Sequence, residues 1–482
     1  MHLVNISVQD FVHQPLEEEW ARLSVYARRM RCFVSPKPAP PSEAALKLLN
    51  TRFSGRCMLP RLRDIRWFSA SLNYLELILP LIVSPILTTF ELLVDAPRPL
   101  NALHVISALE ALAPAYNSLV EVYVPQFTIH DPRIIDAASA LLLKCNPDKL
   151  RRFLVGSALS TEAFIYATRL PNLEQFIIRT GTTEPGISLP TSTFPSLKSL
   201  KINTTYPHSP LLQTIAHIQS TTFTNLDLEF PAAAMGTFLL TTLTALRPRN
   251  LHQTLTRLSI TSGGGFDFDG VIIQPLLFLN QLTTLEINLL CSQDRCPYKL
   301  SDKDLEALVK AMPKLISLCL GQIPCSRPAN NTMRSLVSIA KHCKHLEELI
   351  IHTNIEAIVA GAFQRHHWEG NSLEDPLSTF VGCPLSRIMF GPCPMPREQQ
   401  GAVIFALTLL RLFPRLATVT ALHPNAEADP QFELVNGVIA THRRICANIA
   451  AAGKLSNSLS YARLLMYCSH RYGGQLILCP AV

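Results

Sequence analysis

One glycine-rich stretch of this chain has a composition that could bind an ion or a phosphate. The run from Gly263 to Gly270 contains Asp267 and Asp269. It lacks the Lys-Ser/Thr pair of a phosphate-binding loop and the bidentate glutamate of a calcium loop. We therefore interpret the run as a loop between structural repeats.

A pair of adjacent histidines is the next candidate for metal chemistry. His366 and His367 lie in the longest interval between two repeats, and no further ligand pair stands beside them at helical spacing. The pattern favours a solvated loop insertion over a metal site.

The cysteines also offer few metal ligands. The sequence holds thirteen of them, scattered and without any Cys-x-x-Cys motif. Cys291 with Cys296, or Cys383 with Cys393, would need partners for zinc that the sequence does not identify. Scattered cysteines within apolar runs are typical of reduced thiols that pack as small hydrophobic residues.

No motif of a known catalytic machinery is present in the sequence. It contains no Walker loop, HExxH, GxSxG or kinase motif set. We expect a chain that is not an enzyme, that needs no metal and no cofactor, and that acts through a binding surface.

Composition indicates a well-packed globular protein. Apolar residues make up 48% of the 482 residues and charged residues 16%, which argues against disorder. The formal charge of +7 is mild for this length and does not favour nucleic-acid binding. The longest apolar stretch, residues 72–94, is interrupted by Glu76 and Glu91, so we expect no membrane span. The start lacks a signal-peptide pattern, and we expect a cytoplasmic or nuclear location.

A repeated Leu-x-x-Leu-x-Leu pattern, with other bulky apolar residues replacing leucine freely, runs through most of the chain. Thirteen copies follow one another at an average spacing of about 30 residues. Their first residues are Leu62, Leu87, Leu119, Leu150, Leu173, Leu197, Phe223, Leu255, Leu282, Leu315, Leu346, Leu385 and Leu416.

Each copy predicts a short parallel strand. Positions four and six of the pattern point into the core, and positions three, five and seven point outward to one shared face. Helix-start signals lie between the copies, at Asp131-Pro132, Ser209-Pro210 and Ser301. The sequence therefore predicts an α/β leucine-rich-repeat solenoid, a curved horseshoe with a parallel inner sheet, outer helices and about thirteen degenerate repeats.

The two ends of the chain depart from this pattern. We expect residues 1–50 to hold a helix, an edge element and a proline-rich linker, and residues 51–430 to form the solenoid. Residues 431–482 lose the strand pattern and include the helix-like stretch 432–452, so we expect a C-terminal helical cap.

The N-terminal segment and the repeats together resemble a known family. A helix containing Trp20 leads into Tyr26-Ala-Arg-Arg-Met30-Arg, a proline-rich break at 35–41 follows, and Leu-Pro-x-Leu or Phe-Pro-x-Leu segments introduce degenerate repeats. Over roughly residues 3–430 this resembles fungal F-box proteins with a leucine-rich-repeat domain. In that family an F-box binds a Skp-type adaptor of a cullin-based ubiquitin ligase, and the repeats hold the substrate.

The sequence departs from the family in one respect. No Leu-Pro-x-Glu-Ile segment of an F-box is present near Met1. We therefore expect a Skp-type adaptor as a partner only if an F-box is encoded upstream.

Two functions follow from this reasoning. The first is a non-catalytic, protein-binding leucine-rich-repeat protein that forms the substrate-recognition part of an SCF-type ubiquitin ligase. The alternative is a leucine-rich-repeat scaffold or regulator with no link to a ligase.

Nucleic acid is not expected as a partner, because basic and acidic residues balance on the outward strand positions. The basic ones are Arg66, Arg152, Arg179, Lys201, Arg257 and Arg387, and the acidic ones are Asp64, Glu91, Glu121, Asp227, Glu229, Glu286 and Glu348.

A partner-binding patch is predicted on the concave face at repeats four to six. Arg152, Arg179 and Lys201 point outward there, beside apolar Leu154 and Ile177. Such a patch suits an acidic or phosphorylated peptide with an aliphatic anchor. The next candidates are outward residues of the C-terminal repeats: Ile350, Met389 and Leu422.

Overall fold

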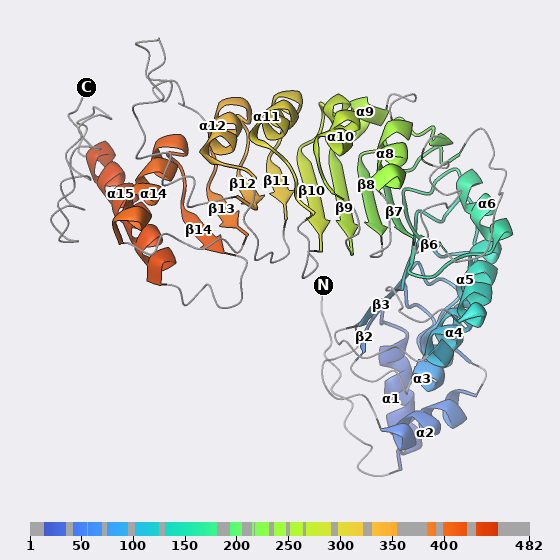
Figure 1. The fold of residues 1–482 in the computed structure, drawn as a ribbon. Coiled ribbons are helices and arrows are strands. Elements are labelled where there is room, and N and C mark those ends of the chain that lie inside the picture. Colours follow the sequence, from blue (N-terminus) through green and yellow to red (C-terminus); the bar gives the residue numbers. More distant parts are fainter. Residues whose placement is uncertain are drawn as a thin grey trace, which may run out of the picture. The chain divides into compact units, whose positions relative to one another are not determined.

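The protein alternates strands and helices along nearly its whole described length (Figure 1). The structure is a computed structural model that describes residues 14–34, 42–54, 56–69, 75–94, 102–124, 131–180, 193–204, 215, 217–230, 236–246, 251–263, 267–290, 297–321, 330–353, 383–391, 399–421 and 430–451. It divides into two compact units, Met1–Glu229 and Phe230–Val482.

The first unit alternates helices and strands from α1 to β6 and ends with strands β7 and β8. Its helices are α1 (Glu17–Ala27), α2 (Glu43–Phe53), α3 (Leu75–Ile82), α4 (Ala102–Ala111), α5 (Pro132–Lys144) and α6 (Thr161–Arg169), with a 3₁₀ turn η2 (Ala113–Ala115). Its strands are β1 (Cys32–Val34), β2 (Asp64–Ser69), β3 (Thr89–Val94), β4 (Glu121–Val124), β5 (Arg152–Val155), β6 (Gln175–Thr180), β7 (Ser199–Thr204) and β8 (Asn225–Phe230, whose last residue belongs to the second unit).

The second unit continues the alternation and ends in helices. Its helices are α8 (Gly236–Ala245), α9 (Leu251–Thr254), α10 (Gly270–Ile273), α11 (Asp302–Ala311), α12 (Met333–His342), α14 (Gln399–Leu412) and α15 (Pro430–Ala451), with η3 (Gln274–Phe278). Its strands are β9 (Arg257–Ser262), β10 (Thr284–Leu289), β11 (Ser317–Leu320), β12 (Glu348–Ile351), β13 (Arg387–Phe390) and β14 (Thr418–Ala421).

Sheet topology confirms the predicted fold class. In the described part of the chain the strand order is the chain order, β1 to β14, and the registered pairs are parallel, for example β4 with β5 and β12 with β13. Each of the thirteen predicted strands is present. Connections that return through a helix or loop to a parallel neighbour define an α/β repeat solenoid.

The repeat pattern supplies the core of both units. Side chains at the first position of all thirteen copies have no solvent exposure, and those at the fourth position are at most 2% exposed. Phe153 and Phe176 occupy the fourth position on neighbouring strands, with ring centroids 6.4 Å apart. Burial of this kind contributes about 1.5–3 kcal/mol per large side chain, so the inward row is what holds successive repeats together.

Helix starts follow the capping signals where the structure describes them. The Asp131 carboxylate accepts a hydrogen bond from the Arg133 amide at 2.9 Å and begins α5. Ser301 and Asp304 form a reciprocal capping box at the start of α11. Of the helix expected after Ser209-Pro210, only Ile215, His217 and Ile218 lie within the described residues.

The N-terminal segment contains one helix that the sequence did not indicate. Helix α2 follows the proline-rich stretch, and Ser42 caps it by accepting a hydrogen bond from the Ala45 amide at 3.1 Å. Trp20 of α1 packs edge-on against Phe53 of α2, with ring centroids 6.3 Å apart. The three-residue strand β1 pairs with β2, so the edge element of this segment lies at the start of the sheet.

Candidate functional site

Strands β4 to β8 present alternate side chains to the outward face of the first unit. Phe153 and Val155 on β5 are buried, whereas Arg152 and Leu154 between them are half-buried. The same alternation holds on β8. Because the strands are parallel and in register, outward residues form rows that cross the sheet from strand to strand.

One of these rows is apolar across three consecutive strands. Tyr123 on β4 is registered with Leu154 on β5, and Leu154 with Ile177 on β6. All three side chains are half-buried. Neighbouring strands lie about 4.8 Å apart, so the three side chains form a short continuous apolar strip, which we call the apolar row.

The register places the three predicted basic residues in three different rows. Arg152 is opposite Gln175, Lys201 is opposite Ile177 at the end of the apolar row, and Arg179 is opposite Asn203. They therefore share no row, and Arg179 on the middle strand β6 lies furthest along the strand direction.

The predicted basic residues lie beside acidic residues. Arg152 lies 3.5 Å from Glu121 on the preceding strand. Lys201 lies 3.4 Å from Asp227 and 3.2 Å from Glu229 on the following strand. Arg152 and Lys201 of the predicted basic and apolar patch are thus paired with acidic side chains, and its role in binding stays a prediction.

Electrostatics at these residues follow from the same contacts. Burial lowers the pKa of Lys201, but the attraction of Asp227 and Glu229 outweighs it and the pKa is raised overall. Burial lowers the pKa of Arg179, and the charge of Glu229 opposes the shift. Both side chains remain cationic at neutral pH.

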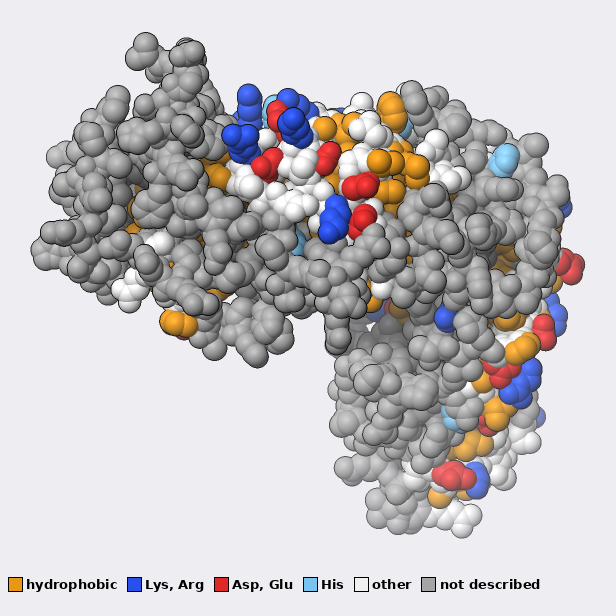
Figure 2. All heavy atoms as spheres, viewed as in Figure 1, with side chains coloured by type: hydrophobic (Ala, Val, Ile, Leu, Met, Phe, Trp, Pro, Cys, Tyr) orange, Lys and Arg blue, Asp and Glu red, His pale blue; other side chains and the backbone are white. Residues whose placement is uncertain are grey.

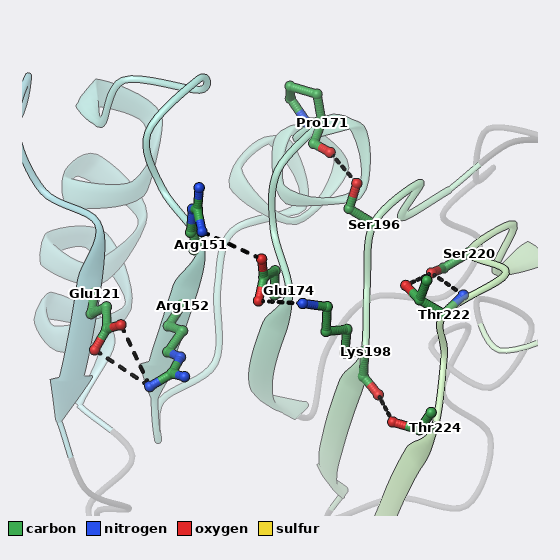
Figure 3. A network of polar contacts seen from close by, with 10 residues as sticks. All are labelled: Glu121, Arg151, Arg152, Pro171, Glu174, Ser196, Lys198, Ser220, Thr222 and Thr224. Carbon is green, nitrogen blue, oxygen red and sulfur yellow. Dashed lines mark hydrogen bonds and ion pairs between the residues drawn. The ribbon is translucent and has the colours of Figure 1, made fainter. Parts of the chain in front are cut away.

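A second set of ion pairs lies where strands β5 to β7 begin (Figure 3). The Glu174 carboxylate lies between Arg151 at 3.8 Å and Lys198 at 2.9 Å. These residues occupy the second position of the pattern, which the sequence reasoning did not consider. The alternation of basic, acidic and basic residues at this position in three successive repeats could have predicted these ion pairs.

Hydroxyl groups tie the same edge of the sheet together. The Thr224 hydroxyl donates to the Lys198 carbonyl oxygen at 3.2 Å, and the Ser196 hydroxyl donates to the Pro171 carbonyl oxygen at 2.5 Å. Figure 3 shows both bonds. Each bond joins one repeat to the next, from the repeat of β6 to that of β8.

Charge pairing between neighbouring elements recurs elsewhere. On the second unit, Arg257 lies 3.0 Å from Glu286 and Arg387 lies 3.1 Å from Glu348. Basic and acidic side chains also lie side by side over α11 and α12 in Figure 2.

One of the C-terminal candidates, Ile350, is less accessible than the apolar row. Ile350 is only 8% exposed although it occupies an outward position. It is registered with Met389, which is half-buried. Leu422 lies outside the described residues.

The described residues of the glycine-rich stretch belong to the connection between β9 and α10 or to the start of α10. The Asp269 carboxylate accepts hydrogen bonds from the amides of Val271 and Ile272 and begins α10. Gly270 lies against Asp304 so closely that an added Cβ would stand 2.6 Å from its Oδ1 atom. Asp269 therefore serves as a helix cap here.

Candidate metal ligands do not gather in the described part of the chain. No group of three or more His, Cys, Asp or Glu side chains there could hold a metal ion. His366, His367, Cys291, Cys296 and Cys393 lie outside the described residues. Among the described helices, none is both long and apolar enough to cross a bilayer.

Comparison with known proteins gives a similarity of structure only. No family model and no curated protein matches the chain. One solved structure to which it is similar is the crystal structure of the Rad7 and Elc1 complex in yeast, with a TM-score of 0.39 and 14% sequence identity over 74% of this chain and 75% of that one. The class of the protein follows from its own geometry: it is an α/β repeat solenoid with a parallel sheet.

Proposed function

We propose that this chain is a non-catalytic protein-binding leucine-rich-repeat protein that holds a partner protein on the outward face of β4 to β7. The apolar row of Tyr123, Leu154 and Ile177 carries the proposal. An apolar strip on a sheet face with polar and charged side chains around it is suited to burial against the aliphatic or aromatic side chains of a partner.

The paired charges around the apolar row support a role in specificity. Glu121 with Arg152, and Lys201 with Asp227, flank the row on two sides. Charged residues around an apolar centre align a partner and disfavour wrong ones, while the centre supplies most of the affinity. Arg179 lies one row further along the same strands.

The finer proposal is that the chain is the substrate-recognition part of an F-box, SCF-type ubiquitin ligase. Its support is the resemblance of the segment around Trp20 and of the repeat introductions to fungal F-box proteins. The alternative is a leucine-rich-repeat scaffold or regulator with no ligase link. Co-purification of a Skp-type adaptor with the native gene product distinguishes the two.

The binding surface is tested by comparing captured partners between matched variants. Leu154→Asp with Ile177→Asp replaces two members of the apolar row, and Thr284→Asp with Ser317→Asp makes the same change at two outward positions of the second unit. Quantitative mass spectrometry of proteins captured from cell extract should show a partner lost only with the first variant. Equal loss with both variants, or with neither, would contradict this surface.

A further inference from the structure

The charge of the chain is concentrated near its N-terminus. Residues 21–63 contain ten basic residues and one acidic residue, a formal charge of +9, whereas the whole chain carries +7. The acidic residue, Glu43, pairs with Lys47 at 2.6 Å, and Arg52 pairs with Glu17 from outside the stretch. Pairing within the segment therefore neutralises only a small part of this charge.

Five arginines of this stretch, here called the N-terminal arginine cluster, come from three adjoining segments. They lie at the end of α1, at the start of β1 and before β2, and all five are exposed. The members are Arg28, Arg29, Arg31, Arg61 and Arg63.

Hydrogen bonds hold the three segments of the cluster together. The Arg31 guanidinium donates to the Arg61 carbonyl oxygen at 3.3 Å. The amide of Arg63 donates to the Arg31 carbonyl oxygen at 2.8 Å. Arg28 and Arg29 immediately precede this contact in the chain, so the cluster is one continuous surface.

The cluster differs from the other basic residues along the sheet. Arg66, Arg152, Lys198, Lys201, Arg257 and Arg387 each pair with an acidic side chain on a neighbouring repeat. Within the described residues, no member of the N-terminal arginine cluster forms an ion pair. The C-terminal end of α1 favours positive charge and accounts for Arg28 and Arg29, but it does not account for the other three.

The extent of the cluster limits what it could bind. The positions equivalent to Arg63 in the next three repeats are occupied by Thr88, Val120 and Arg151. Thr88 and Val120 are uncharged, and Glu174 neutralises Arg151. The unpaired charge therefore covers only two strands, about 5 Å apart. A nucleic-acid backbone needs a longer series of cations, so the surface suits a compact anion.

Apolar side chains adjoin the cluster on α1. Tyr26 is 64% exposed and Val25 is 50% exposed. Both lie in the last turn of α1, within four residues of Arg29 in the chain. A peptide that reaches the arginines could therefore also make side-chain contacts.

We propose that the N-terminal arginine cluster binds a phosphorylated segment of a partner protein. Arginine contacts phosphate oxygens through two parallel N–H groups, and a phosphoserine offers three acceptor oxygens and close to two negative charges. Several guanidinium groups around one phosphate is a known mode of phosphopeptide recognition. This site is independent of the proposed function, because it uses a different part of the first unit.

Fluorescence anisotropy with the full chain tests this site. The probe is a labelled twelve-residue glycine-serine peptide with two phosphoserines, compared with the same peptide carrying serine or glutamate at those places and with a twelve-nucleotide single-stranded RNA. We expect the phosphopeptide to bind at least tenfold more tightly than each of the other three. Equal binding of the glutamate peptide, or tighter binding of the RNA, would overturn the proposal.

Matched variants place the binding on the cluster. Arg31→Gln, Arg61→Gln and Arg63→Gln together should weaken phosphopeptide binding at least tenfold. The control Lys310→Gln, Lys341→Gln and Lys344→Gln removes as many charges from the second unit and should leave binding unchanged. If the first variant melts at a lower temperature than the native chain, Arg28→Gln with Arg29→Gln replaces it, with an expected loss of at least threefold. Unchanged binding in the variant used would refute the site.

Discussion

At the residue scale, the outward face of the sheet depends on charges that pair between strands. Lys201 shows this most clearly, because it lies between the carboxylates of Asp227 and Glu229 while its side chain is 32% exposed. Exposed ion pairs contribute only about 0.2–1 kcal/mol each. Their main effect is to remove free charge from the surface around Leu154 and Ile177.

Reversing the charge of Lys201 should therefore destabilise the first unit. Lys201→Glu would place a third carboxylate beside Asp227 and Glu229, and we expect a loss of about 1 kcal/mol in the free energy of unfolding. Chemical denaturation measures it. The control Lys299→Glu changes an exposed lysine without an acidic partner among the described residues and should have a smaller effect. The same loss in both variants would show that the ion pairs are not the cause.

Buried thiols give a prediction about pH. Burial raises the pKa of Cys145 to about 12 and is the main cause that raises the pKa of Cys343 to about 12. Both thiols should therefore resist alkylation by iodoacetamide at pH 8.5 in the folded chain and react once it unfolds. Because the folded pKa lies above that of the unfolded chain, these groups favour folding below about pH 9, and the contribution is lost as the pH rises toward 12. Mass spectrometry of the alkylated peptides measures the reaction. Alkylation of either cysteine as fast in the folded chain as in urea would contradict the predicted protection.

At the element scale, the fourth position of the pattern is buried on each of the thirteen predicted strands, whereas outward positions range from buried, as at Ile350, to half-buried, as at Leu154. Leu318 on β11 has no solvent exposure, whereas Ile316, which precedes the strand, is 43% exposed. The two side chains have the same number of carbon atoms, so their positions in the pattern determine their energetic importance.

This difference can be measured directly by truncation. We expect Leu318→Ala to lower the free energy of unfolding by roughly 2–5 kcal/mol, because it leaves a cavity in the core. Ile316→Ala should cost less than about 1 kcal/mol, since its side chain is already partly in water. Similar losses in urea denaturation would contradict the claim that the burial of Leu318 gives it the larger contribution to stability.

Neighbouring helices are joined by an acidic side chain at the start of α11. The Asp302 carboxylate accepts hydrogen bonds from the Thr332 amide at 2.8 Å, from the Thr332 hydroxyl at 2.6 Å and from the Ser335 hydroxyl, all at the beginning of α12. Hydrogen bonds to a charged group contribute about 1.5–3 kcal/mol. The carboxylate thus fixes the position of one repeat against the next.

Removing this carboxylate should weaken the second unit. We expect Asp302→Ala to lower the free energy of unfolding by roughly 2–4 kcal/mol, because three donors at the start of α12 lose their acceptor. The exposed neighbour Lys303→Ala serves as the control. A change in thermal denaturation no larger than that of the control would show that solvent replaces the carboxylate without cost.

At the scale of the whole molecule, the sequence predicted the strands better than the contacts between them. The pattern from Leu62 to Leu416 located each predicted strand, because apolar residues at alternate positions and at a regular spacing along the chain are the ones that become buried. It missed α2, where a capping serine follows a run of prolines. It placed Arg152, Arg179 and Lys201 on the outward face but did not predict that Arg152 pairs with Glu121 and Lys201 with Asp227 and Glu229. Such pairing depends on the register between strands about 30 residues apart.

Binding of a partner on the apolar row is tested most directly by hydroxyl-radical footprinting of the full chain with and without its captured partner. We predict that the partner lowers the rates of oxidation of Tyr123, Leu154 and Ile177, while the rate at exposed Val271 of the second unit stays unchanged. Unaltered oxidation of all three side chains in a saturated complex would contradict the proposed binding face.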